Sequence, residues 1–158
     1  MAKKKICITL SRVFPATLPR AGELTEFETK LKAGKKIHTI RRNFDLWAVN
    51  AEKMQRGDFY LSVRQWSGKP YRSKQREIHT IDKPIGVQRI QISYHHDFHA
   101  NKPYLTARII GGNNIDVAEL AKNDGLSLSD FADWFFGKEP QGDMTFNGVI
   151  IHFTDFRY

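Results

Sequence analysis

The sequence predicts a single α+β domain, a small and mostly antiparallel β-barrel with peripheral helices. Two observations support this prediction. About six short segments rich in β-branched and aromatic residues alternate with turn residues, as strands do. Between them lie segments in which apolar residues recur at helical spacing, flanked by helix-start and helix-stop residues. The 158 residues suffice for one domain with a sizeable core, and no repeat, linker or low-complexity tract divides them.

The first part of the chain is expected to alternate strands with helices. Thr25 is expected to cap a helix, because Glu28 stands at the spacing of a capping box and Gly34 offers a left-handed stop. Apolar residues recur at helical spacing from Phe44, and Gly57 ends that pattern. The expected elements are strands at 6–10, 37–41 and 59–66 and helices at 26–33 and 44–56.

The second part is expected to contain further strand pairing and two helices. The turn residues at 67–70 predict a hairpin whose second strand is 71–78. Asn114 and Ser127 are expected to cap the two helices, and Gly125 stops the first of them. The expected elements are strands at 71–78, 87–94, 104–110 and 148–154 and helices at 115–122 and 128–136.

The charge balance is strongly basic. The 25 Lys and Arg against 17 Asp and Glu give a formal net charge of +8 and a pI of about 9.7. Such a surface attracts polyanions, most often phosphates, although solubility alone also explains it. Cys7 is the lone cysteine, which excludes an internal disulfide framework. No segment is long and apolar enough to span a membrane, and no signal-peptide core follows the basic start, so we expect a cytoplasmic location.

The run GKKIHTIR, from Gly34 to Arg41, is the centre of a wider resemblance. The segments that carry it follow one another in this order: Ile8–Leu10, Phe27–Gly34, Lys35–Arg41, Gly57-Asp58, Ala121–Ser127 and Val149–Phe153. Their order resembles the ASCH domain, a PUA-like β-barrel family associated with RNA binding. The resemblance covers most of the chain except 64–110, where an enlarged hairpin region is expected as an insertion in the single domain at 1–158.

One branch of this family contains bacterial acetylcytidine amidohydrolases. The resemblance implies a catalytic set of Lys36, Thr39 and Asp124, where the family enzyme has glutamate at the last position. Thr39 would attack the amide, and Lys36 would act as base in its neutral form. Residues three apart on a strand point to opposite faces, so these two converge only if Lys36 lies in a turn before the strand or if a bulge intervenes. The ordinary alternatives are a strand threonine, a solvated lysine and a turn aspartate.

The other polar residues of this run are expected to bind the ligand. Lys35, His38 and Arg41 can supply charge and hydrogen bonds to a nucleoside or to RNA. Gly34 is expected to shape the end of the helix, and Ile37 and Ile40 to face the core. No cofactor is implied.

A second basic segment follows at 64–76. It interleaves cations with two aromatic residues, which can neutralise phosphates and stack on bases. A solvated hairpin edge protected by its charges is the alternative. The candidate binding residues are Arg64, Trp66, Lys69, Tyr71, Arg72, Lys74 and Arg76. Arg72, Lys74 and Arg76 are expected to share one face of a strand.

Two other clusters are assigned structural roles. The run from His95 to His99 contains metal-ligand residue types, but adjacent histidines on a strand point apart, so we expect a polar hairpin tip and no metal. Aromatic residues at helical spacing are expected to pack in the core. They are Phe131, Trp134, Phe135 and Phe136.

Three functions are compatible with these features. The first is a binding module that holds RNA or a modified nucleoside in a cleft lined by the Gly34–Arg41 run. The second is an amidohydrolase that removes an acyl group from acetylcytidine-like nucleosides. The third is an accessory protein of a phage or mobile element without catalysis. The oligomeric state is not predicted.

Overall fold

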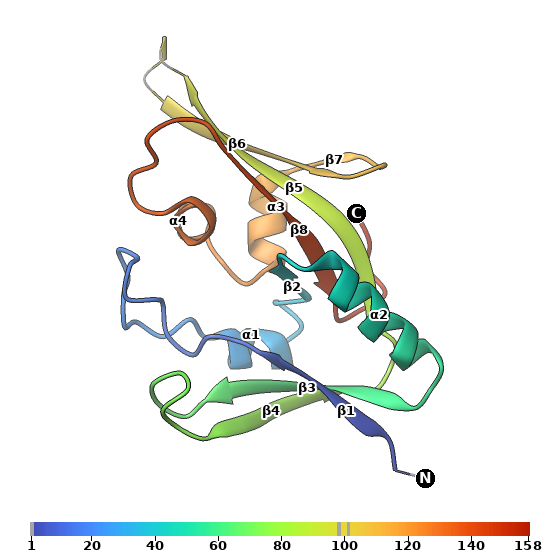
Figure 1. Cartoon of the computed structure of the whole chain (residues 1–158). Coiled ribbons are helices and arrows are strands. Elements are labelled where there is room, and N and C mark those ends of the chain that lie inside the picture. The colour runs from blue at the N-terminus through green and yellow to red at the C-terminus, as the bar shows by residue number, and fades with distance from the viewer. Residues whose placement is uncertain (1, 98, 101) are drawn as a thin grey trace.

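Two β-sheets face one another across the molecule in the computed structural model, which describes residues 2–97, 99–100 and 102–158 (Figure 1). The smaller sheet has the order β1-β3-β4 and the larger one the order β2-β8-β5-β6-β7. In the smaller sheet β1 runs parallel to β3, whereas every pairing of the larger sheet is antiparallel. The α+β class with mostly antiparallel strands is therefore confirmed. No ladder between described strands joins the two sheets into a closed barrel.

The elements follow one another in the order shown in Figure 1. The strands are β1 (Lys4–Thr9), β2 (His38–Arg41), β3 (Phe59–Trp66), β4 (Gln75–Ile81), β5 (Gly86–Asp97), β6 (Lys102–Ile109), β7 (Asn114–Ile115) and β8 (Met144–His152). The helices are α1 (Phe27–Lys32), α2 (Phe44–Gln55), α3 (Val117–Asn123) and α4 (Leu128–Phe136).

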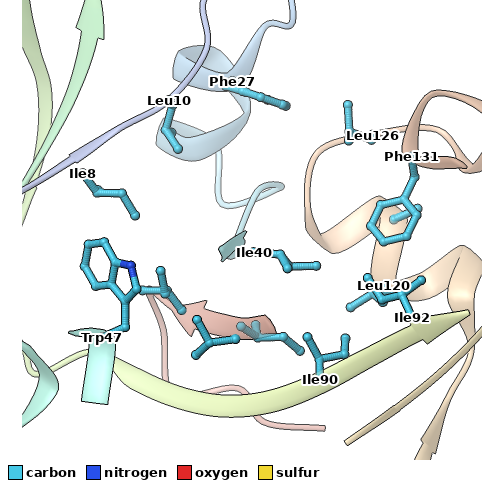
Figure 2. Packing of buried hydrophobic residues seen from close by; sticks show 14 of the residues in the cluster. Ile8, Leu10, Phe27, Ile40, Trp47, Ile90, Ile92, Leu120, Leu126 and Phe131 are labelled. Carbon is cyan, nitrogen blue, oxygen red and sulfur yellow. The ribbon is translucent and has the colours of Figure 1, made fainter. Parts of the chain in front are cut away.

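One hydrophobic core joins the two sheets. Strand β8 lies between β2 and β5, and its last five residues, 148–152, are all buried, as expected for a central strand. Figure 2 shows Ile8 and Leu10 on one side of the core and Ile90 on the other, with Ile40 of β2 between them. Strand β2 is thus held in the interior, where its polar side chains lose contact with water.

The expected start of α1 is wrong. The capping residue is Glu26, in a left-handed conformation with φ +62°, and its side chain makes no capping hydrogen bond. Thr25 instead donates its hydroxyl proton to the carbonyl of Ser11, at 2.7 Å. The hydroxyl oxygen still accepts a long hydrogen bond from the amide of Phe27, at 3.4 Å, but the shorter contact ties Thr25 to the loop after β1. The expected left-handed glycine after the helix is confirmed, because Gly34 adopts φ +73°.

Several other boundaries differ from the expected ones. Asn114 does not cap α3; it pairs with Arg108 in the short strand β7, and Asp116 caps the helix through the amides of Ala118 and Glu119. Strand β4 begins only at Gln75, so the first half of 71–78 lies outside the strand. Strand β8 begins four residues before the expected start at 148. Strand β3 and helix α4 have the expected bounds.

Candidate functional site

A cavity of about 200 Å³ lies where β2 meets the ends of β1, α1 and α3 and one face of α4. All three expected catalytic residues line it. The lining residues are Leu10, Ser11, Phe27, Lys36, Thr39, Ile40, Arg41, Asp124, Trp134 and Phe135. Polar groups therefore form one part of the wall and aromatic rings another.

The turn before β2 directs Lys36 into this cavity. After Gly34, the backbone amides of Lys35 and Lys36 both donate to the carbonyl of Lys30, at 2.8 and 3.0 Å. Strand β2 begins only at His38. Because Lys36 precedes the strand, the alternation of strand side chains does not apply to it, and it lines the same cavity as Thr39.

Lys36 and Asp124 form a buried ion pair. The ammonium lies 3.0 Å from the Asp124 carboxylate and 2.6 Å from the Asp124 carbonyl, and the two side chains are 1% and 7% exposed. The ammonium also stands 4.3 Å from the centre of the Phe27 ring. Asp124 is placed by the end of α3, where it is the capping residue.

Burial and charge act against each other on this pair. Burial lowers the pKa of Lys36, Asp124 opposes that shift, and the positive charges of Arg41 and Lys30 reinforce it. Burial alone would raise the pKa of the Asp124 carboxyl, but Lys36 and His38 outweigh it and hold that pKa below its usual range. The aspartate therefore stays ionised while the lysine is biased towards losing its proton.

Arg41 holds the hydroxyl group of Thr39. Its Nη1 donates to Thr39 Oγ1 at 2.9 Å and its Nη2 donates to the carbonyl of Thr9 at 2.7 Å. Thr39 is only 3% exposed. Burial lowers the pKa of Arg41 and Asp124 raises it, and the guanidinium remains a cation at any ordinary pH. A positive group next to a hydroxyl stabilises negative charge that develops on its oxygen.

The other two expected ligand residues of the run lie outside this cavity. His38 is wholly buried behind Asp124, with Nδ1 3.4 Å from the carboxylate and Nε2 2.7 Å from the hydroxyl of Tyr158. Lys35 is exposed and lines a separate open pocket of about 700 Å³ together with Lys30. From the run, the cavity therefore takes the polar residues Lys36, Thr39 and Arg41, together with Ile40.

Some residues of the site carry no distinctive signal in the sequence. Ser11 follows a strand like many other serines, and Phe27 and Trp134 show only the spacing of ordinary core residues. Of the aromatic residues of α4, Phe131 and Phe136 are buried as expected, whereas Trp134 and Phe135 are partly buried and pack against the core.

Two arginines of the basic hairpin between β3 and β4, Arg64 and Arg76, have acidic partners. Arg76 donates to Glu28 of α1, at 2.6 Å, and this contact together with Lys32 lowers the pKa of Glu28 to about 2. Arg64 is hydrogen-bonded to Gln75 and lies 3.8 Å from Glu77. These two arginines therefore hold the hairpin in place.

The tip of the hairpin is exposed and cationic. Trp66 and Tyr71 pack with ring centres 5.1 Å apart, and Tyr71 is 89% exposed at φ +62°. Lys69, Arg72 and Lys74 are exposed, with no carboxylate partner among the described residues. The expected row of cations on one strand face is wrong, because β4 begins after Lys74.

The histidine run lies at the end of β5. His95 stacks on Tyr104, with ring centres 4.7 Å apart, and contacts the hydroxyl of Thr106. Phe98 of this run lies outside the described residues. No group of three or more metal-ligating side chains is found in the part of the chain that the structure describes. In that same part, no helix has the length and apolar character needed to cross a membrane.

Comparisons of the chain with protein-family models, with curated proteins and with solved structures find no match.

Proposed function

We propose that the protein is a hydrolase that removes an acyl group from the exocyclic amine of a cytidine-like nucleoside. The observation that carries the proposal is the convergence of the Thr39 hydroxyl, the buried Lys36–Asp124 pair and Arg41 on one cavity. The resemblance of the Gly34–Arg41 run to the ASCH-type acetylcytidine amidohydrolases, members of a PUA-like family, supports the same chemistry.

The reaction assigns one task to each polar group. Thr39 Oγ1 attacks the acyl carbon, and its proton passes to neutral Lys36 and then to the nitrogen that leaves as the free amine. The acyl ester on Thr39 is then cleaved by water, which releases a carboxylic acid and restores the hydroxyl. Arg41, whose Nη1 donates to Thr39 Oγ1 at 2.9 Å, stabilises the negative charge on that oxygen as its proton leaves.

Asp124 performs its task although it is shorter than the family glutamate. Its carboxylate and its carbonyl both accept hydrogen bonds from Lys36 Nζ, at 3.0 and 2.6 Å. The end of α3 brings the backbone of Asp124 close enough for the shorter side chain to reach. Asp124 therefore orients the lysine that exchanges protons with Thr39.

The size of the cavity favours a small substrate. Its volume of about 200 Å³ is below the range of roughly 300–1,000 Å³ in which drug-sized ligands bind. Phe27, Trp134 and Phe135 supply apolar and aromatic wall against which a planar base can lie. A single base with its acyl group matches this space better than a folded oligonucleotide does.

The test is incubation with acetylcytidine and detection of cytidine by chromatography. Thr39→Val keeps the volume of the side chain and removes the nucleophile, so turnover is expected to vanish, whereas Thr39→Ser retains a hydroxyl and a measurable rate. Thr145→Val changes an exposed threonine of β8 and should leave the rate unchanged. Equal turnover by Thr39→Val and the parent protein would refute this mechanism.

A second proposed function is RNA binding at the hairpin tip. The observation that favours it is the hairpin tip, where the half-buried Trp66 and the exposed Tyr71 lie among three exposed cations that lack carboxylate partners in the described chain. These cations are Lys69, Arg72 and Lys74. Exposed aromatic rings stack on unpaired bases while cations neutralise phosphates. This surface can act with or without hydrolysis in the cavity.

The salt dependence of RNA binding tests this second function. A variant with alanine in place of Lys69, Arg72 and Lys74 is expected to weaken binding to single-stranded RNA and to reduce the slope of log K against log salt by about 2. A charge-matched control replaces three exposed lysines elsewhere: Lys4, Lys5 and Lys83. No binding by the parent protein at low salt, or equal losses in both variants, would contradict the assignment.

A further inference from the structure

A set of polar contacts links Asp124 to Tyr158 through His38, a residue that does not line the cavity. The Nδ1 atom of His38 stands 3.4 Å from the Asp124 carboxylate, and its Nε2 atom lies 2.7 Å from the hydroxyl of Tyr158. Asn123, the neighbour of Asp124, donates from its side-chain amide to the same hydroxyl, at 3.0 Å. The side chains of the neighbouring residues Asn123 and Asp124 are thereby linked through Tyr158 and His38.

The contacts of Tyr158 determine which nitrogen of His38 carries the proton. Burial raises the pKa of the Tyr158 hydroxyl, so it keeps its proton. The hydroxyl oxygen already accepts from Asn123, and among the described residues His38 Nε2 is the acceptor placed to receive its proton. A neutral imidazole that accepts at Nε2 carries its own proton on Nδ1, which faces Asp124.

The backbone around this set is tied down independently. The side chain of Gln88, in β5, accepts from the backbone amide of Tyr158 at 3.1 Å and donates to a backbone oxygen of Tyr158 at 3.2 Å. The amide of Ile37 donates to the carbonyl of Asn123 at 2.9 Å, which joins the start of β2 to the end of α3. Two residues next to the His38 imidazole, Tyr158 and Asn123, are therefore held in place by β5 and by the residue before β2.

We propose that His38 is a positioning residue, held by Tyr158 in the tautomer that donates from Nδ1, and that it fixes the Asp124 carboxylate against Lys36. The inference rests on the proposed hydrolase function. His38 touches neither the cavity nor the substrate, and it acts through Asp124. Lys36 Nζ and His38 Nδ1 both approach the same carboxylate oxygen, Asp124 Oδ1, at 3.0 and 3.4 Å. His38 Nδ1 is fully buried and makes no closer hydrogen bond to any described residue, so Asp124 is the acceptor available to its proton.

The tautomer is measured by nitrogen NMR of the imidazole groups in the parent protein and in Tyr158→Phe. The parent is expected to show His38 protonated on Nδ1. Phenylalanine keeps the ring and removes the hydroxyl, so the variant is expected to show a mixture of tautomers. Tyr94→Phe removes the hydroxyl of another buried tyrosine, in β5, and should leave the His38 signals unchanged.

The kinetic effect of Tyr158→Phe is measured on acetylcytidine. Loss of one orienting hydrogen bond is expected to lower kcat by about tenfold and to leave KM within about twofold, because no contact with substrate is removed. A purely structural role would instead lower the amount of folded protein with kcat per folded molecule preserved. If Tyr158→Phe does not fold, Asn123→Ala removes the donor that orients the same hydroxyl and should change both tautomer and kcat in the same direction.

The two proposals fail in different ways. A parent protein without turnover overturns the hydrolase function, and the nitrogen spectra still decide whether Tyr158 and His38 hold Asp124. An active parent whose Tyr158→Phe variant keeps both the Nδ1 proton and kcat overturns the positioning role alone. A parent His38 protonated on Nε2 also overturns it.

Discussion

The ammonium of Lys36 and the carboxylate of Asp124 lie 3.0 Å apart although 88 positions separate them in the chain. Each residue stands just outside a regular element, Lys36 before β2 and Asp124 at the end of α3. Both are nearly excluded from water, so each charge depends on the other to offset the cost of burial. The pair therefore couples the stability of the fold to the site.

The first prediction concerns the removal of one partner of this pair. Lys36→Met keeps much of the side-chain volume and removes the ammonium that lies 3.0 Å from the buried Asp124 carboxylate. Leaving a buried charge without its counterion is expected to lower the free energy of unfolding by about 3 kcal/mol. Urea denaturation followed by circular dichroism measures the change.

The matched control removes both charges. In Lys36→Met combined with Asp124→Leu no charge remains unpaired, so the double variant is expected to recover a large part of the lost stability. If Lys36→Met alone lowers the free energy of unfolding by less than about 1 kcal/mol, the buried charge of Asp124 does not depend on Lys36.

A second prediction uses two glycines with nearly the same backbone. Gly125 has φ +83° and a Cβ placed there would lie 3.3 Å from the side chain of Lys36, whereas Gly111 has φ +79° and open space around it. Alanine at either position is expected to cost about 1 kcal/mol for the left-handed conformation. Gly125→Ala should cost more and should also slow hydrolysis, because it displaces Lys36.

Thermal unfolding and turnover of the two variants measure the difference between them. The backbone strain is common to both, so the difference isolates the contact with Lys36. Equal losses of stability, with hydrolysis unchanged in both variants, would show that the packing of Gly125 on Lys36 has no consequence for the site.

A third prediction concerns acid stability and His152. Burial, with help from the neighbouring His38 and Arg157, lowers the pKa of His152 from 6.5 to about 3 in the folded chain. Above pH 6.5 the His152 imidazole is neutral in both the folded and the unfolded chain. Between pH 6.5 and the folded pKa, only the unfolded chain takes up the proton. Stability is therefore expected to fall by about 1.4 kcal/mol per pH unit below about pH 6, down to the folded pKa.

Urea denaturation between pH 7 and 5 tests this, because carboxylates hardly titrate in that range. His152→Gln cannot take up the proton and should flatten the dependence of stability on pH. His79→Gln changes an exposed histidine of β4 and should retain the slope of the parent. A parent slope that persists in His152→Gln would assign the acid sensitivity to another group.

Local signals predicted the elements that depend on local interactions. Helix α4 begins where expected because the hydroxyl of Ser127 accepts from the amide of Asp130, at 3.1 Å. Thr25 and Asn114 are equally good caps in isolation, but the first donates to the Ser11 carbonyl and the second pairs with Arg108. Tertiary contacts of this kind have no signature in the neighbouring residues, and the same holds for the separation of the strands into two sheets.

The candidate site was predictable only in part, because its residues come together from distant parts of the chain. The resemblance named Lys36, Thr39 and Asp124, and the structure brings all three to one cavity. The contact of His38 with Tyr158 spans 120 positions and follows from the way the chain after β8 returns to β2. The residues next to His38 and Tyr158 in the sequence do not indicate this contact. His38 was therefore expected to contact the ligand, whereas the structure places it beside Asp124 and outside the cavity.

The last prediction is the pH dependence of hydrolysis. The base must be neutral, and burial lowers the pKa of Lys36 from its ordinary value while Asp124 opposes that shift. The rate at saturating acetylcytidine is therefore expected to rise with pH along a single limb that reports Lys36. Asp124→Asn removes the negative charge that favours the ammonium, so the rising limb should move to lower pH, even though the maximal rate falls because the lysine is less well oriented. Lys36→Arg cannot become neutral and should show no rising limb at all. A limb that moves to higher pH in Asp124→Asn, or that persists in Lys36→Arg, would mean that another group accepts the proton of Thr39.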